Sequence, residues 1–275
     1  MTVSTRRLVD YRVRNGVARL ELGNPPVNSC THEMMRDLDD AVLHARFEDG
    51  VHVLVIGGAG EEAFCAGADL NMLNAVTPSF RYHFFLHAQE TLSRLEHTPK
   101  LVIAALNGSA RGAGLAIAMA ADLRIALDDA ARPAEHRATF GLDEVATGLL
   151  PGMGGTRRLA RLVGQARAME LMTTGELLTA ARAHEIGLVN HVWAAMGAGE
   201  FAERVQRYAE GFCPPRRAAH AIGLIKRALH GRSEAGPDEA EALERELLQR
   251  LFDGPDAREG LRAALAGRAA DFTGR

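Results

Sequence analysis

Residues 101–114 decide the fold of this chain: Leu101-Val102-Ile103-Ala104-Ala105-Leu106-Asn107-Gly108-Ser109-Ala110-Arg111-Gly112-Ala113-Gly114. The first six form a short, nearly continuous apolar run, as expected for a parallel strand that is buried on both faces. A turn rich in small residues follows, and we expect a helix from about Gly112 to Ala120. A strand that leads through a tight turn into a helix is the building unit of α/β proteins with right-handed crossovers.

The segments before this stretch extend the α/β pattern towards the N-terminus. Residues 51–56 form a second buried strand of β-branched and apolar residues. The segments 8–13 and 17–22 alternate apolar and polar residues around Asn15-Gly16, which predicts a hairpin. Between the hairpin and the second buried strand, Thr31 can cap a helix that runs to about residue 47.

The end of the chain has a different composition. After Trp193 the sequence becomes rich in Ala, Glu, Arg and Leu with helical periodicity, interrupted by Pro and Gly. We therefore expect an α-helical region rather than more sheet. The predicted helical segments are 198–211, 215–230, 237–252 and 256–270.

The composition is that of an ordinary globular protein. The 275 residues are 47% hydrophobic and 24% charged, enough apolar material for one large or two small domains. The net charge of -3 and the lack of a Lys/Arg run argue against a nucleic-acid partner. Cys30, Cys65 and Cys213 are scattered without CxxC spacing, which fits a reducing cytosol.

The sequence indicates neither a secretory signal nor a membrane span. Residues 1–15 contain no apolar region ahead of a small-residue cleavage site. The longest apolar stretch, residues 101–119, is interrupted by Asn107, Arg111 and glycines. We therefore expect a cytoplasmic protein with no membrane partner.

Two glycine-containing turns have the composition of anion-binding sites. Residues 57–70 lead from a strand to a helix that we expect to begin at Ala68, and residues 107–114 repeat this arrangement. The dinucleotide fingerprint GxGxxG fails because Ala63 takes the third glycine position, and GxxxxGK(S/T) does not occur. Two such turns on adjacent strands can each give one N–H to a single oxygen. Each donor of such an oxyanion hole stabilises a transition state by roughly 3–4 kcal/mol.

Five motifs in register resemble the crotonase superfamily, the enoyl-CoA hydratase/isomerase family. This resemblance covers the chain from about residue 8 to residue 195. It implies an α/β fold in which residues 1–195 form a crotonase-type spiral of ββα turns and residues 196–275 form a C-terminal α-helical region. That region commonly packs between subunits, so a homotrimer or a homohexamer is implied. The motifs are Asn24-Pro25-Pro26-Val27-Asn28, residues 63–70, residues 106–108 continuing to 122, residues 140–144 with 150–156, and residues 175–176 with 186–190.

The resemblance also implies a substrate and a site. The substrate is an acyl-CoA thioester, so coenzyme A arrives as part of the substrate and no separate cofactor or metal is expected. The N–H groups of Ala68 and Ala113 would hold the thioester oxygen as it becomes an enolate, with Glu144 as the base. Ala113 stands where the family usually has glycine. The residues expected to border the adenine and pantetheine are Val27, Ser29, Ala66, Asp69 and Leu70.

The carboxylates discriminate between the reactions of this family. Its hydratases use two glutamates, at the positions of Ala116 and Glu144, and a positioned general base contributes roughly 10²–10⁴-fold. Its Δ3-Δ2-enoyl-CoA isomerases, enzymes of fatty acid metabolism, use a single glutamate at the position of Glu144, so isomerisation is the leading hypothesis. Dienoyl-CoA isomerases and chlorobenzoyl-CoA dehalogenases place an aspartate where this chain has Gly152. A hydratase with one glutamate, a decarboxylase-type enzyme and a CoA-binding scaffold without activity remain as alternatives.

Several other charged and aromatic residues suggest no separate site. His83 and His87 have metal-ligand spacing, but an amphipathic helix along an acyl tunnel with Met72, Phe80, Phe84 and Phe85 is the preferred interpretation. We expect Asp143 to cap a helix or face solvent, Asp122 to be structural, and Arg157, Arg158 and Arg161 to form a solvated face. Gly267 replaces a lysine that often reaches the CoA phosphate, and Arg268 is the candidate substitute.

Overall fold

A six-stranded sheet forms the centre of the molecule. The structure, a computed structural model, describes residues 7–234 and 236–275. The strand order is β1-β2-β3-β5-β7-β9, and only β1 and β2 are antiparallel. The predicted hairpin and the two predicted buried strands are confirmed. The strands are β1 (Val9–Arg14), β2 (Val17–Leu22), β3 (Val53–Gly58), β5 (Leu101–Leu106), β7 (Leu123–Asp128) and β9 (His191–Ala194).

A second, smaller sheet is purely parallel. Its strands β4 (Ala63–Cys65), β6 (Ser109–Arg111) and β8 (Phe140–Gly141) pair in that order. Each strand of this sheet follows a strand of the larger sheet or the connection after it, so the chain winds through ββα units as the resemblance predicts.

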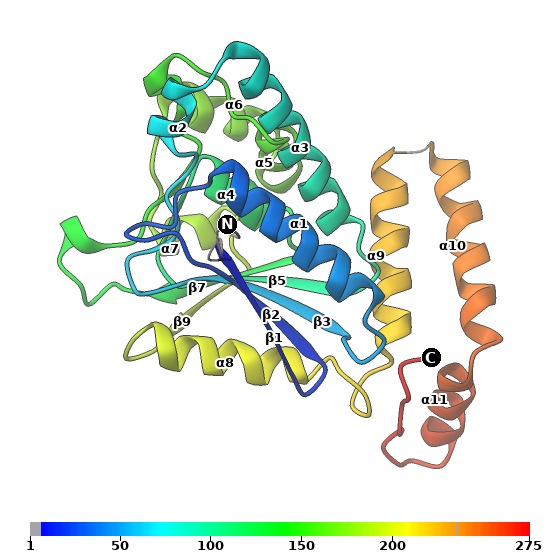
Figure 1. Cartoon of the computed structure of the whole chain (residues 1–275). Helices are drawn as coiled ribbons and strands as arrows, with labels where there is room; N and C mark the ends of the chain where they lie inside the picture. Colours follow the sequence, from blue (N-terminus) through cyan, green and yellow to red (C-terminus); the bar gives the residue numbers. More distant parts are fainter. Residues whose placement is uncertain (1–6, 235) are drawn as a thin grey trace, which may run out of the picture.

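Helices cover both faces of the larger sheet (Figure 1). Side chains alternate along the strands, so Leu54 and Val102 belong to one buried cluster and Val53 and Ile103 to another. The first cluster includes residues of α1 (His32–Phe47), α3 (Pro78–Glu96) and α4 (Ala113–Met119), and the second includes residues of α8 (Ala198–Glu210). Thus α8, the first helix of the region 196–275, packs on the sheet, and the proposed division of domains stays a prediction.

The remaining helices are short or lie beyond the sheet. Thr31 caps α1 as predicted, because its side chain accepts a hydrogen bond from the Met34 N–H. Helix α2 begins at Leu70, not at Ala68, because Asp69 occupies the capping position and accepts from the Met72 N–H. The other helices are α2 (Leu70–Ala75), α5 (Gly155–Val163), α6 (Gln165–Thr174), α7 (Ala180–Glu185), α9 (Ala219–Glu234), α10 (Pro237–Phe252), α11 (Pro255–Leu265) and the 3-10 helices η1 (Ala134–His136) and η2 (Glu144–Thr147).

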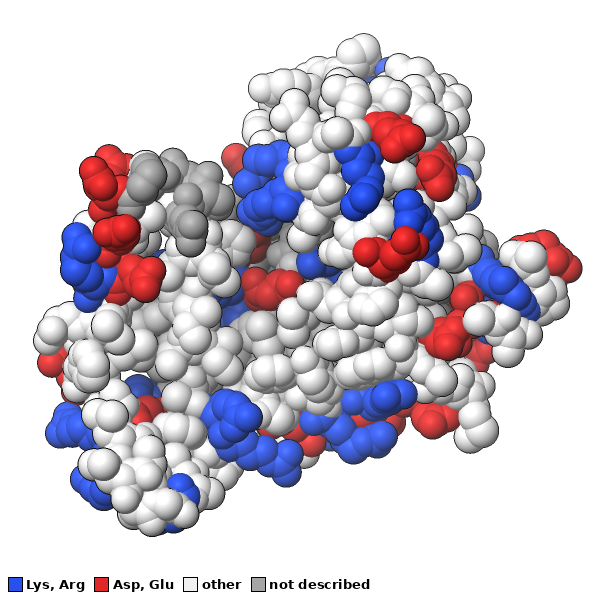
Figure 2. Space-filling view, turned by 180° about the vertical axis from the view of Figure 1, so that it is seen from behind, with Lys and Arg blue, Asp and Glu red and all other residues white. Residues whose placement is uncertain are grey.

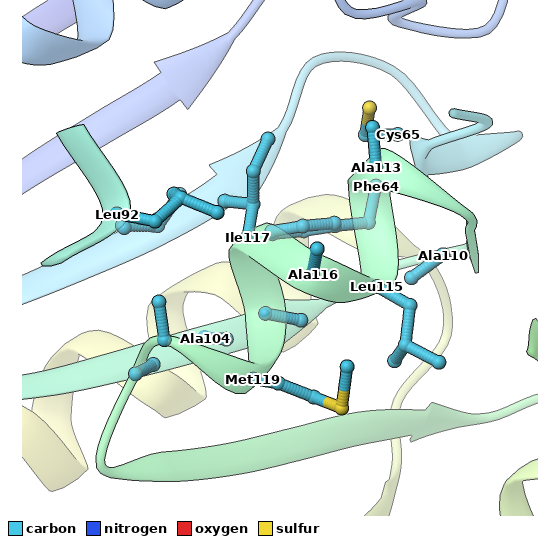
Figure 3. Close-up of a cluster of buried hydrophobic side chains, with 14 of the residues drawn as sticks. Phe64, Cys65, Leu92, Ala104, Ala110, Ala113, Leu115, Ala116, Ile117 and Met119 are labelled. Carbon is cyan, nitrogen blue, oxygen red and sulfur yellow. The ribbon is translucent and has the colours of Figure 1, made fainter. Parts of the chain in front are cut away.

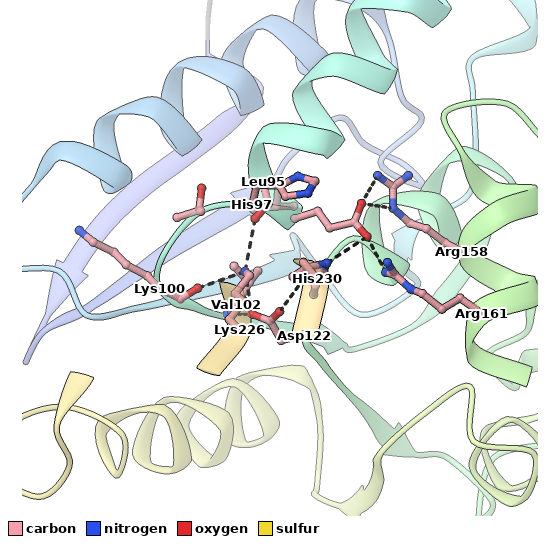
Figure 4. Close-up of polar contacts among 12 residues, drawn as sticks. Leu95, His97, Lys100, Val102, Asp122, Arg158, Arg161, Lys226 and His230 are labelled. Atoms are coloured by element: carbon pink, nitrogen blue, oxygen red, sulfur yellow. Dashed lines mark hydrogen bonds and ion pairs between the residues drawn. The ribbon is translucent and has the colours of Figure 1, made fainter. Parts of the chain in front are cut away.

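Buried charges attach α9 and α5 to the core (Figure 4). Lys226 of α9 is 6% exposed and pairs with Asp122 at 2.8 Å, which supports the structural role expected for Asp122. Glu96 at the end of α3 accepts from Arg157, Arg158 and Arg161. Burial would raise the pKa of Glu96, but the arginines lower it to about 2. The expected solvated face is therefore wrong for Arg158, which is buried against Glu96.

Charges of both signs are mixed on the surface, and the cysteines are buried. Figure 2 shows Lys and Arg interspersed with Asp and Glu over the back of the molecule. All three cysteines are buried thiols, which fits a reducing compartment, and the cytoplasmic location stays a prediction. Across the part of the chain that the structure describes, every helix is too short or too polar to cross a membrane.

Gly114 allows helix α4 to pack directly on strand β4. A Cβ atom at position 114 would lie 2.0 Å from the carbonyl oxygen of Cys65, far inside contact distance. We predict that Gly114→Ala lowers the free energy of unfolding by about 1–3 kcal/mol, since the two backbones must separate. Gly199→Ala is the matched control, because nothing lies within 4 Å of its added Cβ and alanine favours a helix. Urea denaturation of both variants measures this, and a Gly114→Ala variant as stable as the wild type would contradict it.

Candidate active site

The smaller sheet brings three chain segments to one edge. Because β4, β6 and β8 are parallel, their carboxyl ends meet at the same side, where ligands of parallel sheets commonly bind. The segment 66–68 follows β4, Gly112-Ala113 follows β6, and Asp143-Glu144 follows β8. A pocket of about 410 Å³ opens there. Its lining consists of Ala66, Gly67, Ala68, Leu70, Leu73, Phe85, Arg111, Gly112, Ala113, Asp143, Glu144, Ala146, Thr147, Leu149, Leu150, Gly152 and Met153.

The three segments touch through backbone and glycine positions. A Cβ atom on Gly112 would lie 3.2 Å from Glu144 Oε1, and the φ of Gly112 is +48°, a conformation that other residues rarely adopt. A Cβ atom on Gly67 would lie 3.2 Å from the carbonyl oxygen of Arg111. The glycines thus let the carboxylate of Glu144 approach the turn that precedes Ala113.

Two backbone N–H groups of the pocket lining are free to donate. Within the described residues, neither the Ala68 N–H nor the Ala113 N–H has a hydrogen-bond acceptor. Their neighbours are committed, since Asp69 N donates to the Cys30 carbonyl at 3.0 Å and Gly112 N donates to the Gly141 carbonyl at 2.9 Å. Ala113 is the first residue of α4, where N–H groups have no intrahelical partner. The arrangement offers two unpaired donors on adjacent turns.

Glu144 is the carboxylate that is poised beside these donors. Its Oε2 is buried and has no hydrogen-bond partner among the described residues. Burial raises the pKa of Glu144 above its ordinary value, its own backbone N–H opposes that rise, and the charge of Asp143 adds to it. A half-buried carboxylate with a raised pKa is a stronger base than a fully solvated one, which suits a group that accepts a proton.

The second position, Ala116, lies in the hydrophobic core. Its side chain is 1% exposed and does not line the pocket. Figure 3 shows Ala116 on α4 among other buried apolar side chains, including those of Leu115 and Ile117. No ionisable group of α4 therefore accompanies Glu144, since Ala113–Met119 contains none.

Phe85 occupies the space next to Gly152. A Cβ atom at position 152 would lie 2.8 Å from the Phe85 ring, so an aspartate there requires the ring to move. Of the four side chains expected along the acyl tunnel, only Phe85 lines the pocket. Phe84 is 1% exposed and packs in the core, whereas Phe80 is 37% exposed and does not line the pocket.

The residues expected to border the coenzyme lie in or beside the same turn. Ala66 and Leu70 line the pocket. The carbonyl oxygens of Val27 and Ser29 accept hydrogen bonds from the Ala66 N–H and the Asn24 side chain, and the Asp69 carboxylate caps α2. These five roles stay predictions.

The structure shows the surroundings of Arg268, the candidate for the CoA phosphate, and of His83, which has metal-ligand spacing with His87. Arg268 pairs with Glu259 on α11 at 2.6 Å, so its guanidinium is already engaged. His83 is exposed, and the described part of the chain contains no group of three or more His, Cys, Asp or Glu side chains that could hold a metal.

One ion pair in the pocket wall was not predicted from the sequence. Asp143 occupies the N-cap position of η2 and is partly exposed, but its side chain makes no capping hydrogen bond. Its Oδ2 instead accepts from Arg111 Nη2 at the pocket wall. The sequence signal for this pair was Arg111, a charged residue inside a glycine-rich turn. Its partner could not be identified, because 32 residues separate the two.

Comparison with known proteins identifies the family. The family model for enoyl-CoA hydratase/isomerase matches residues 12–275. The chain is 34% identical over 266–268 residues to bacterial relatives such as 1,2-epoxyphenylacetyl-CoA isomerase of Escherichia coli, covering 96% of this chain and 97% of that protein. It is 32% identical to crotonyl-CoA hydratase of Syntrophomonas wolfei, covering 90% of each chain.

Solved structures agree with the sequence comparison. An enoyl-CoA hydratase structure from Geobacillus kaustophilus superposes with a TM-score of 0.90 at 35% identity, covering 99% of this chain and 98% of that chain. The structural match and the family match both extend over nearly the whole length of the chain. This chain belongs to the enoyl-CoA hydratase/isomerase family of the crotonase superfamily.

Proposed function

We propose that this protein moves a double bond of an enoyl-CoA from C3 to C2, with Glu144 as the only base. The observation that carries the proposal is the unpartnered Oε2 of Glu144 at the pocket, combined with an apolar, buried Ala116. An acyl-CoA substrate is supported by the relatives, which include a crotonyl-CoA hydratase and a 1,2-epoxyphenylacetyl-CoA isomerase. The apolar part of the pocket lining, including Leu73 and Phe85, suits an acyl chain.

The reaction requires one proton transfer in each direction. Glu144 removes a proton from C2 of the 3-enoyl thioester, and the electron pair moves towards the thioester oxygen. The N–H groups of Ala68 and Ala113 stabilise the resulting dienolate as an oxyanion hole. Protonated Glu144 then returns the proton to C4, so the double bond comes to lie between C2 and C3 and no co-reactant is consumed.

Hydration by a single glutamate is the second candidate. It is favoured by relatives named as hydratases, such as crotonyl-CoA hydratase. It demands more of the site, because a water must be both oriented and deprotonated. A decarboxylase-type enzyme would instead release CO2 from an acyl-CoA that carries a free carboxylate. A CoA-binding scaffold without activity would bind acyl-CoA and convert neither 3-enoyl-CoA nor 2-enoyl-CoA.

The Glu144→Gln variant tests the proposed base. We expect the rate of 3-enoyl-CoA to 2-enoyl-CoA conversion to fall about 10²–10⁴-fold, because the general base is lost while the backbone donors remain. Glu170→Gln, on an exposed position of α6, is the matched control and should keep the wild-type rate. The conversion is followed by the absorbance of the conjugated thioester. An undiminished rate in Glu144→Gln would rule out this residue as the base.

The pH profile of the wild-type enzyme provides a second test. Glu144 must be ionised to accept the proton, and burial raises its pKa above the ordinary 4.5. We therefore expect kcat/KM for isomerisation to fall on the acid side with a midpoint above 4.5, about tenfold per pH unit below it. A profile that stays flat down to pH 4.5 would contradict a buried, single base.

We also infer that the C-terminal helices bind further copies of the chain. Helices α9, α10 and α11 expose large apolar side chains, which monomeric proteins rarely leave in groups. The exposed residues are Ile225, Leu229, Leu248, Phe252, Leu261 and Leu265. We expect a trimer or hexamer by light scattering, and Leu261→Asp to lower the mass while Met196→Asp, exposed elsewhere, leaves it unchanged. A monomeric wild type would refute this assembly.

A further inference from the structure

Arg111 and Asp143 form an ion pair in the wall of the pocket. The guanidinium Nη2 of Arg111 donates to Oδ2 of Asp143. Both side chains line the pocket and are partly shielded from solvent, with 40% and 24% of their surface exposed. Every other residue of the pocket lining except Glu144 is uncharged, so this pair carries the remaining charge of the site.

The pair joins the two turns that hold the reacting groups. Arg111 is two residues before the N–H donor Ala113, and Asp143 is directly before Glu144. The backbone pairing of β6 with β8 ends at Arg111 and Gly141, followed by one bond from the Gly112 N–H to the Gly141 carbonyl at 2.9 Å. Beyond that bond, the Arg111–Asp143 ion pair joins the two turns. Helix η2 has no side-chain capping hydrogen bond.

The pair also sets the charge around Glu144. Burial raises the pKa of Glu144 and the charge of Asp143 adds to that rise, while the cation of Arg111 lies against the Asp143 carboxylate. The neighbouring elements contribute little charge to the pocket. Helix α2 has no ionisable residue, the Asp69 carboxylate before it is engaged as the helix cap, and α3 presents the Phe85 ring. Helix α6, which packs on η2, carries Arg167 and Glu170, both exposed.

We propose that Arg111 and Asp143 are positioning residues for the reaction, which hold the turn of Glu144 against the turn of Ala113 and balance the negative charge beside Glu144. The inference rests on the proposed role of Glu144 as base. It assigns neither residue a contact with the reacting atoms. A purely structural ion pair would affect stability alone, whereas this pair must change the protonation of Glu144 in opposite directions when each partner is removed.

Single and double variants separate the two partners. Arg111→Gln leaves Asp143 ionised and unpaired beside Glu144, so the acid limb of the kcat/KM profile should move to higher pH. Asp143→Asn removes the negative charge and leaves the cation, so the limb should move to lower pH. Each displacement should be about half a pH unit to one pH unit, as expected for charges several Å apart in a partly solvated site. The double variant should return close to the wild-type limb.

The turnover number should respond differently from the pH limb. We expect kcat to fall about 10- to 100-fold in both single variants and in the double variant, because the base shifts relative to the donors. Arg111→Lys keeps the cation and should keep both the wild-type limb and most of kcat. Arg14→Gln is the matched control, since it breaks an arginine–carboxylate pair with Glu203 whose residues do not line this pocket.

A measurement without turnover distinguishes this inference from the proposed function. Titration of the Glu144 carboxyl carbon by ¹³C NMR in the free protein, assigned by the loss of its signal in Glu144→Gln, reports protonation directly. Opposite displacements in Arg111→Gln and Asp143→Asn support the pair even if no 3-enoyl-CoA is converted. Displacements in the same direction, or none in either folded variant, overturn the inference while isomerisation by the wild type would still support the proposed function.

Discussion

The close contact between β4 and α4 is the constraint on which the site depends. Gly114 has no side chain, so helix α4 rests directly on the backbone of Cys65. This contact brings the beginning of α4, with Ala113, next to the turn that follows β4. The larger sheet supplies the buried framework, but the geometry of the donors comes from the way the small parallel sheet and α4 share one edge.

The same edge determines the electrostatics of the pocket. Ala68 and Ala113 with their free N–H groups, the Glu144 carboxylate and the Arg111–Asp143 ion pair line a cavity whose other walls are largely apolar. In such surroundings dipoles act more strongly than they do in water, because little solvent competes with them. Burial of Glu144 raises its pKa, and the same burial strengthens the donors that would stabilise an enolate. One structural cause thus supports both halves of the proposed chemistry.

The sequence predicted the parts of the molecule that depend on local patterns. The hairpin, the buried strands, the α1 cap at Thr31 and the C-terminal helices follow from periodicity and turn chemistry, and the family followed from motifs in register. The errors concern partners that are distant along the chain. Arg158 looked solvated because periodicity cannot reveal a glutamate 62 residues earlier, and Asp143 looked solvated for the same reason.

The start of α2 and the acyl tunnel show a second limit. Ala68 follows the glycine turn that resembles a helix N-terminus, but Asp69 caps α2, so the helix begins later and the Ala68 N–H remains free. Phe84 and Phe85 are adjacent in sequence, and only packing decides that Phe84 enters the core while Phe85 faces the pocket. Side-chain direction within an amphipathic helix depends on the elements that cover it.

The burial of Ala116 bears on how Glu144 alone could both remove the proton from C2 and return it to C4. A group that takes a proton from C2 and returns it to C4 needs a pKa high enough to accept the proton and low enough to release it. Partial burial, which raises the pKa of a carboxyl without full desolvation, favours such a group. A second carboxylate at position 116 would repel the charge of Glu144 and raise the pKa of one of the two groups. That arrangement helps an enzyme that needs one carboxyl as an acid and the other as a base to add water. Here Ala116 adds no charge, and Arg111 opposes the charge of Asp143. The local electrostatics therefore suit a single residue that carries the proton in both directions.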